Sequence, residues 1–154
     1  MKVAHRDLKP ENILYYSKTE SNEDDKVRIG DYTVAMNLDG DDKLITGEAG
    51  TLPFLAPEVF TEESFYAKPL DIWAFGVTML IYLNEKLPFT GTTDFEIKDS
   101  IKQGITEFPE SFSVDLRDIL SKIFTIDPKS RIPIEDALNH KWFEQSEDPV
   151  LLEF

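Results

Sequence analysis

Four residues near the start of the chain carry side chains that could do chemistry together: Asp7, Lys9, Asn12 and Asp31. The first three place a base, a cation and a metal ligand on one short loop, and Asp31 could meet the same metal from the facing side. Phosphoryl transfer needs such a set, because its catalysis consists mainly of aiming the acceptor hydroxyl, neutralising phosphate charge and holding metal ions. Each residue alone would more often be a turn or capping residue, so the prediction rests on their joint spacing.

Two short β-prone runs lie between these residues and would bring Asp31 back towards the loop. The runs are residues 13–16 and 27–29, and a polar segment, residues 17–26, separates them. This pattern predicts a β-hairpin with a long, solvated tip.

Helical patterns dominate the chain after Pro69. Residues 71–83 are apolar on nearly all sides, which indicates a helix surrounded by other elements. Residues 94–103 predict a more polar helix, Ser113 can cap a third, and Pro133 stands near the start of a fourth. The apolar face of the third helix would consist of Leu116, Ile119, Leu120, Ile123 and Phe124. Without repeats or linkers, the pattern predicts one α+β unit, mainly helical, with a small β-hairpin at the front.

Composition limits the class of protein. The 154 residues are 41% apolar, enough for a buried core, and include no cysteine, which excludes disulfides and thiolate metal sites. Lys and Arg number 16 against 30 Asp and Glu, a net charge of −14, which argues against nucleic acid or an anionic membrane as a partner. The longest apolar stretch, residues 72–83, is too short to span a bilayer, and no signal-peptide pattern follows Met1. We therefore expect an intracellular, cytoplasmic protein without nucleic-acid or membrane partners.

Five segments resemble the motifs of eukaryotic protein kinases, and they occur in that family's order. His5–Asn12 is similar to the catalytic loop, and Asp31–Thr33 stands in the place of Asp-Phe-Gly. Ala56–Glu58 matches Ala-Pro-Glu, and Asp71–Gly76 matches the start of the family's central helix. Arg131 falls where the family keeps an arginine that pairs with the glutamate of Ala-Pro-Glu.

The resemblance implies a role for each of the four residues. Asp7 would orient the substrate hydroxyl and accept its proton, and Lys9 would steady the γ-phosphate of ATP. Asn12 and Asp31 would hold magnesium, so ATP and Mg²⁺ are the implied cofactors and a protein is the implied substrate. Lys9 directly after Leu8 is similar to the pattern of the family's Ser/Thr-specific members.

Further positions of the pattern are expected around these four. Leu14 would lie beneath the adenine ring of ATP. Glu11 is assigned to the ATP-binding loop, although it could instead meet a basic substrate residue or remain a solvated carboxylate. Thr51 would hold the two catalytic side chains in register, and with Phe54 it belongs to the loop that receives the substrate. Asp71 would brace the backbone of the catalytic loop.

Two residues are candidates for regulation. Arg6 is the residue that in this family receives a phosphorylated activation loop through charge-assisted hydrogen bonds, and Thr46 is the nearest candidate phosphosite. Glu48 lies close to the position where relatives carry that threonine, so a permanent negative charge could replace phosphate. The alternative is that Thr46 and Glu48 are ordinary loop residues.

The matching motifs cover only the C-terminal lobe of a kinase, with a domain over residues 1–143 and a short acidic and apolar tail over 144–154. No Gly-rich loop, strand lysine or hinge precedes His5. We therefore expect the N-terminal lobe to come from the same gene product, and the isolated chain to be inactive. The helix over 71–83 should then expose apolar surface. Thr33 also departs from the family, because it replaces the glycine of Asp-Phe-Gly with a β-branched residue.

Two functions from different classes follow from these observations. In the complete protein, the chain would be part of an ATP-dependent protein serine/threonine kinase; alternatively it is a non-catalytic, pseudokinase-like scaffold or a truncated interaction module. The four intact residues favour the kinase, because a scaffold has no chemical need for all of them. The segments 87–89, 101–102 and 128–131 resemble the calcium/calmodulin-dependent kinase group, or its kinase kinases.

Overall fold

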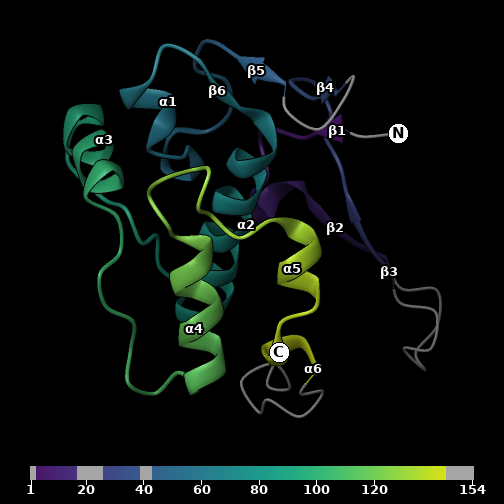
Figure 1. Ribbon diagram of the computed structural model, residues 1–154, viewed down its shortest axis with the longest axis vertical. Coiled ribbons are helices and arrows are strands. Elements are labelled where there is room, and N and C mark those ends of the chain that lie inside the picture. The colour runs from purple at the N-terminus through teal and green to yellow at the C-terminus, as the bar shows by residue number, and fades with distance from the viewer. Residues whose placement is uncertain (1–2, 17–25, 39–42, 145–154) are drawn as a thin grey trace.

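The structure, a computed structural model, describes residues 3–16, 26–38 and 43–144. It is α+β, with helices in its body and short antiparallel strand pairs along its upper and right-hand edges (Figure 1). The strands are β1 (Val3–Ala4), β2 (Ile13–Tyr16), β3 (Lys26–Ile29), β4 (Met36–Asn37), β5 (Leu44–Ile45) and β6 (Phe65–Tyr66). The helices are α1 (Glu58–Thr61), α2 (Ala67–Asn84), α3 (Asp94–Gln103), α4 (Val114–Ile123), α5 (Ile134–Leu138) and α6 (Lys141–Glu144), with 3-10 turns η1 (Pro10–Asn12) and η2 (Leu52–Phe54).

The predicted hairpin is present. Strands β2 and β3 pair antiparallel, with Ile13 opposite Ile29 and Tyr15 opposite Val27, and the pair projects from one side of the molecule (Figure 1). Of the predicted tip, residues 17–26, Lys26 belongs to β3 and the rest lies outside the described residues. The pairs β1–β4 and β5–β6 are not foreseen by the sequence, because strands of two residues are too short to show alternation.

The four predicted helices are present. Helix α3 has the predicted bounds, and the Ser113 hydroxyl caps α4 by accepting a hydrogen bond from the backbone nitrogen of Leu116 at 3.2 Å. Helix α2 begins at Ala67 rather than at residue 71, and Pro69 lies in its first turn, where its missing N–H costs no helical hydrogen bond. None of the described helices is both long and apolar enough to cross a membrane.

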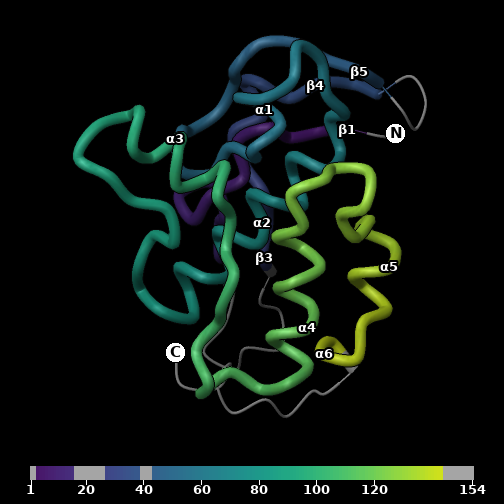
Figure 2. The backbone as a smooth tube through the Cα atoms, turned by 60° about the vertical axis from the view of Figure 1, so that its left-hand side comes forward, coloured from purple at the N-terminus to yellow at the C-terminus, as the bar shows by residue number. Residues whose placement is uncertain are grey.

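The core surrounds α2. Trp73 is fully buried, with its ring 5.5 Å from that of Phe89 and 5.1 Å from that of Phe124. Helix α4 runs alongside α2 (Figure 2). Gly76 permits this approach, because a Cβ there would collide with the side chain of Ile123. The predicted apolar face of α4 is buried against this centre.

The expected apolar exposure of the central helix is wrong for most of α2. Ile72, Val77 and Leu80 are buried, because η2, α4 and β1 pack around the helix. Large apolar side chains are exposed on the hairpin, where Tyr15 and Val27 are 64% and 67% exposed, and also on α3 and α4, where Phe95 and Val114 are 75% and 73% exposed. The exposed apolar side chains of the described residues are therefore spread over several surfaces, of which the hairpin is one.

A buried ion pair closes the base of the fold, as predicted for Arg131. Its two terminal nitrogens donate to the two carboxylate oxygens of Glu58 at 2.7 and 2.8 Å. The remaining guanidinium hydrogens reach the carbonyl oxygens of Thr125, Pro69 and Ile126. The pair thus ties the start of α1 to the turn that follows α4.

Candidate active site

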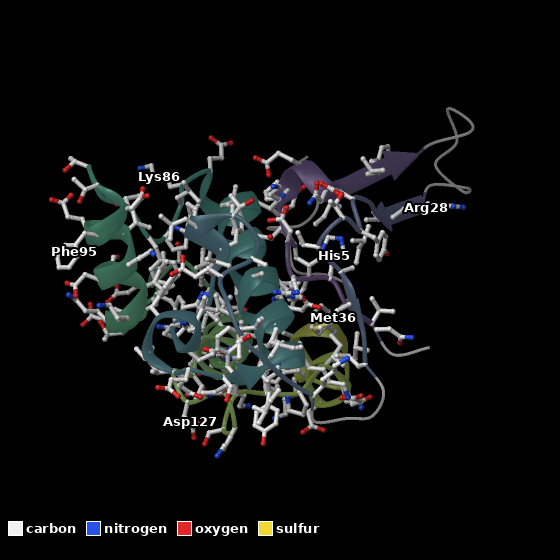
Figure 3. The ribbon with its side chains drawn as sticks, turned by 90° about the horizontal axis from the view of Figure 1, so that it is seen from above. His5, Arg28, Met36, Lys86, Phe95 and Asp127 are labelled. Atoms are coloured by element: carbon white, nitrogen blue, oxygen red, sulfur yellow. The ribbon has the colours of Figure 1, made fainter. Side chains whose placement is uncertain are left out.

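The backbone at the start of the loop His5–Asn12 is held by one carboxylate, as predicted for Asp71. Its two oxygens accept hydrogen bonds from the backbone nitrogens of His5 at 2.7 Å and Arg6 at 2.8 Å. Burial raises the pKa of Asp71, although the two N–H donors act in the opposite direction. The His5 ring donates to the Gly30 carbonyl oxygen at 2.8 Å and meets Tyr32 edge-on at 4.9 Å. The loop is thereby fixed to both α2 and the end of the hairpin, near which Figure 3 shows His5.

A three-membered cluster forms on this braced loop. Lys9 Nζ donates to Asp7 Oδ2 at 2.8 Å and to the Thr51 hydroxyl at 2.7 Å. The Thr51 hydroxyl in turn donates to Asp7 Oδ1 at 2.7 Å. Burial alone would raise the pKa of Asp7, but the hydrogen bonds from Lys9 and Thr51 and the charge of Lys9 outweigh it and hold that pKa below its usual value. Asp7 is therefore an oriented, ionised acceptor at neutral pH.

Gly50 allows Thr51 to reach the cluster. Its backbone has a φ of +110°, a conformation that side chains rarely adopt, and a Cβ at this position would collide with the carbonyl oxygen of Arg6. Sequence analysis places Gly50 next to Thr51 but does not reveal this contact, because the approach joins segments that are far apart in the chain.

The side chain of Asn12 faces the same cluster from η1. Its amide nitrogen donates to the Asp7 carbonyl oxygen at 2.8 Å and approaches Asp7 Oδ2 at 3.4 Å. Because the nitrogen is engaged, the amide oxygen is the atom that could bind a hard cation.

Asp31 is held by Thr33, a contact that the sequence analysis missed. The Thr33 hydroxyl donates to Asp31 Oδ1 at 2.5 Å and the Thr33 backbone nitrogen approaches the same oxygen at 3.3 Å. These two donors lower the pKa of Asp31. The spacing Asp-x-Thr could have indicated the contact, because Asp side chains commonly bind backbone groups two residues on.

Asp31 and Asn12 carry oxygen atoms of the kind that could bind a magnesium ion. Among the described residues there is no group of three His, Cys, Asp or Glu side chains that could hold a metal alone. Mg²⁺ keeps several waters and is usually bound through one or two carboxylates together with substrate phosphates. One carboxylate, from Asp31, and one amide oxygen, from Asn12, match that requirement.

A family model for the protein kinase domain matches residues 1–143. The chain belongs to the protein kinase domain family. The cluster of Asp7, Lys9 and Thr51 and the brace from Asp71 therefore lie in a kinase domain, and the kinase family generally uses ATP and Mg²⁺.

The outer positions of this kinase site are placed as follows. Leu14 is 54% exposed on β2, and Glu11 is exposed on η1. Phe54 of η2 is only 7% exposed and belongs to the hydrophobic core, so its ring is not presented to solvent. A ligand could therefore contact Leu14 and Glu11 directly, whereas the buried ring of Phe54 could not be contacted in this way.

The regulatory candidates of the kinase domain are not in contact with one another. Arg6 donates weakly to the Val34 carbonyl oxygen at 3.4 Å, and its buried Nε has no hydrogen-bond partner among the described residues. Thr46 is exposed directly after β5. Glu48 contacts a different cation, because both of its carboxylate oxygens accept from Lys98 of α3 at 3.0 Å.

Proposed function

We propose that this chain is the C-terminal lobe of an ATP- and Mg²⁺-dependent protein serine/threonine kinase of the cytoplasm. The observation that carries the proposal is the closed cluster in which Thr51 bridges Asp7 and Lys9. A cluster that only stabilised a loop would not need an ionised aspartate with oxygens left partly open to solvent. Asp7 and Lys9 are 12% and 20% exposed, so a substrate can reach them.

Each residue then has a distinct task. Asp7 accepts a hydrogen bond from the substrate hydroxyl, aims it in line with the transferred phosphate and receives its proton. Lys9 neutralises charge on that phosphate, while Thr51 keeps Lys9 and Asp7 at a fixed separation. Asn12 and Asp31 would hold magnesium, and bound Mg-ATP supplies the phosphoryl group. Leu14 would pack beneath the adenine, and Glu11 belongs to the same loop.

Selectivity for serine and threonine is proposed from Lys9 and its neighbours. Lys9 follows Leu8, and its ammonium group is fixed between Asp7 and Thr51 at 2.8 and 2.7 Å. A lysine two positions after Asp7 is the feature of the sequence that supports this selectivity. The loop over Thr51 and Phe54 would receive the adjoining part of the protein substrate, and Thr46 with Arg6 would be the site of phosphorylation control.

The exposed hairpin surface is the proposed contact for the rest of a kinase domain. Leu14, Tyr15, Val27 and Ile29 are all large apolar residues that are more than 40% exposed. An N-terminal lobe from the same gene product would cover this surface and complete the nucleotide site, since burial of apolar area drives such association.

The test is a phosphoryl-transfer assay on the protein expressed from its full coding sequence, with radiolabelled ATP and analysis of the labelled amino acids. We expect label on serine and threonine, and an Asp7→Asn variant to lose about 10²–10⁴-fold in rate. Asp118→Asn, on the exposed face of α4, is the matched control and should retain full activity. Equal transfer by wild type and Asp7→Asn would overturn the assignment, and label on tyrosine would overturn its Ser/Thr part.

A non-catalytic scaffold is the second candidate, and the contact between Thr33 and Asp31 favours it. A side chain that holds one oxygen of Asp31 at 2.5 Å competes with a metal for that carboxylate. Titration with Mn²⁺ and ATP, followed by electron paramagnetic resonance, separates the two. A kinase should bind the metal–nucleotide pair and lose it in Asp31→Asn, whereas a scaffold should show no binding in either protein.

A further inference from the structure

An open groove lies between α1 and α3, with a volume of about 400 Å³. Val59 and Phe60 from α1 line one side, and Phe95 and Lys98 from α3 line the other. Phe95 is 75% exposed, and Figure 3 shows it at the outer edge of α3, at the opposite end of the molecule from Arg28 on the hairpin. The groove therefore combines apolar with charged side chains, is accessible, and is remote from the hairpin.

The cations of this groove are already paired within the chain. Lys98 binds both oxygens of Glu48 at 3.0 Å and lies 5.0 Å from the centre of the Phe60 ring. Lys102 lies 3.8 Å from Asp99. A negatively charged partner would have to break these contacts to bind here.

The acidic residues Glu62 and Glu63 at the rim of the groove, unlike its lysines, are not paired within the part of the chain that the structure describes. Glu62 and Glu63 line the groove and are exposed, and neither side chain has a hydrogen-bond or ion-pair partner among the described residues. Two exposed carboxylates without a partner among those residues give this rim of the groove a negative charge that a basic side chain could neutralise. With a net charge of −14 over the chain, the long-range field also favours a basic partner.

We propose that the α1–α3 groove is a docking site for a segment of a partner protein that combines one large apolar side chain with neighbouring Lys or Arg residues. The apolar side chain would enter between Phe60 and Phe95, and the basic residues would contact Glu62 and Glu63. This docking goes beyond the proposed catalysis, because no lining residue belongs to the catalytic cluster. Its failure would therefore leave the kinase assignment intact.

The test is selection of a displayed library of random 12-residue peptides against the 154-residue chain, read by deep sequencing. Enriched peptides should carry Phe, Leu, Met or Trp within a few positions of two Lys or Arg residues. Selected peptides should bind Phe95→Ser at least tenfold more weakly than wild type, because the exposed ring supplies much of the apolar contact. Glu62→Gln/Glu63→Gln should weaken binding about three- to tenfold and reduce its dependence on salt.

Matched controls separate the groove from general surface effects. Val114 is a comparably exposed apolar residue at the start of α4, so Val114→Ser should bind as wild type does. The double variant Glu107→Gln/Glu110→Gln also removes two exposed negative charges, but outside the groove, so it should have little effect on peptide binding. Circular dichroism spectra verify that each variant is folded.

Three results would overturn the proposal. One is enrichment of acidic peptides, and another is equal binding of the selected peptides to Phe95→Ser. The third is concentration-dependent dimerisation of the chain that Phe95→Ser abolishes, which would assign the groove to a second copy of the chain. Amide shifts in NMR spectra give an independent readout, since a bound peptide should perturb Phe60 and Lys98 and leave Leu14 unchanged.

Discussion

Two ion pairs in this chain use similar chemical groups for different purposes. Arg131 and Glu58 are 0% and 1% exposed, and all five N–H groups of the guanidinium end on a carboxylate or a carbonyl oxygen. Lys9 and Asp7 are 20% and 12% exposed, and both form a hydrogen bond with the Thr51 hydroxyl group.

The difference between the pairs lies in what each can still bind. The pair of Glu58 and Arg131 is saturated and sealed from solvent, so it can only hold α1 against the turn after α4. Asp7 accepts hydrogen bonds from Lys9, from Thr51 and, at 3.4 Å, from Asn12, but its side chain remains partly exposed to solvent. Burial and saturation therefore distinguish a charge that supports the fold from a charge that is available for chemistry.

The largest expected effect is a loss of stability when the buried pair of Arg131 and Glu58 is broken. Arg131→Met should lower the free energy of unfolding by about 3–5 kcal/mol, because it leaves the carboxylate of Glu58 buried without a partner. Lys9→Met should cost at most about 2 kcal/mol, since water can reach Asp7 after the change. Urea denaturation at neutral pH, followed by circular dichroism, measures both.

A double variant shows whether the stranded charge is the cause. Glu58→Gln combined with Arg131→Met removes both charges, and it should be more stable than Arg131→Met alone. If Arg131→Met proved no more destabilising than Lys9→Met, burial would not distinguish a pair that stabilises the fold from one that is available for chemistry.

The sequence predicted the parts of this comparison that depend on local pattern. The hairpin, α3 and the capped start of α4 follow from short-range periodicity and from Ser113, and the family motifs foresee the contacts of Arg131 and Asp71. The short helices α1 and α6 and the pairs β1–β4 and β5–β6 could not be predicted, because elements of two to four residues carry no periodic pattern.

Contacts that depend on tertiary packing were also beyond the sequence. The burial of Ile72 and Val77 depends on how η2 and α4 pack on α2, and the pairing of Glu48 with Lys98 joins residues far apart in the chain. The roles of Asp7, Lys9 and Asn12 in catalysis remain predictions, since the structure shows their contacts and not their reaction.

A smaller loss of stability is expected at Gly50. The contact of Thr51 with Lys9 and Asp7 depends here on the close approach of the Gly50 and Arg6 backbones. Gly50→Ala should cost about 1–3 kcal/mol, because it adds a side chain at a φ of +110° and in collision with the Arg6 carbonyl oxygen. Gly47→Ala is the matched control, since Gly47 has a φ of +81° but nothing within 4 Å of the added Cβ. Urea denaturation should therefore show a clearly smaller loss for Gly47→Ala, and equal losses would mean that the collision is relieved without cost.

The smallest and most local effect is expected at Asp31. The Thr33 hydroxyl favours the ionised carboxylate, so Thr33→Val should raise the pKa of Asp31 towards its ordinary value of 3.8. The backbone nitrogen of Thr33 still donates in that variant, which makes the expected rise partial. Because the folded-state pKa is lowered in the wild type, the stabilisation from this contact is present above the unfolded-state pKa and is lost as pH falls through the folded-state value. Titration of the Asp31 carboxyl carbon by NMR measures the shift; Thr33→Ser should restore the lowered pKa, and Thr46→Val, an exposed control, should leave it unchanged. A wild-type pKa at or above that of Thr33→Val would show that the hydroxyl does not hold Asp31 in solution, and the objection that Thr33 raises against metal binding would then disappear.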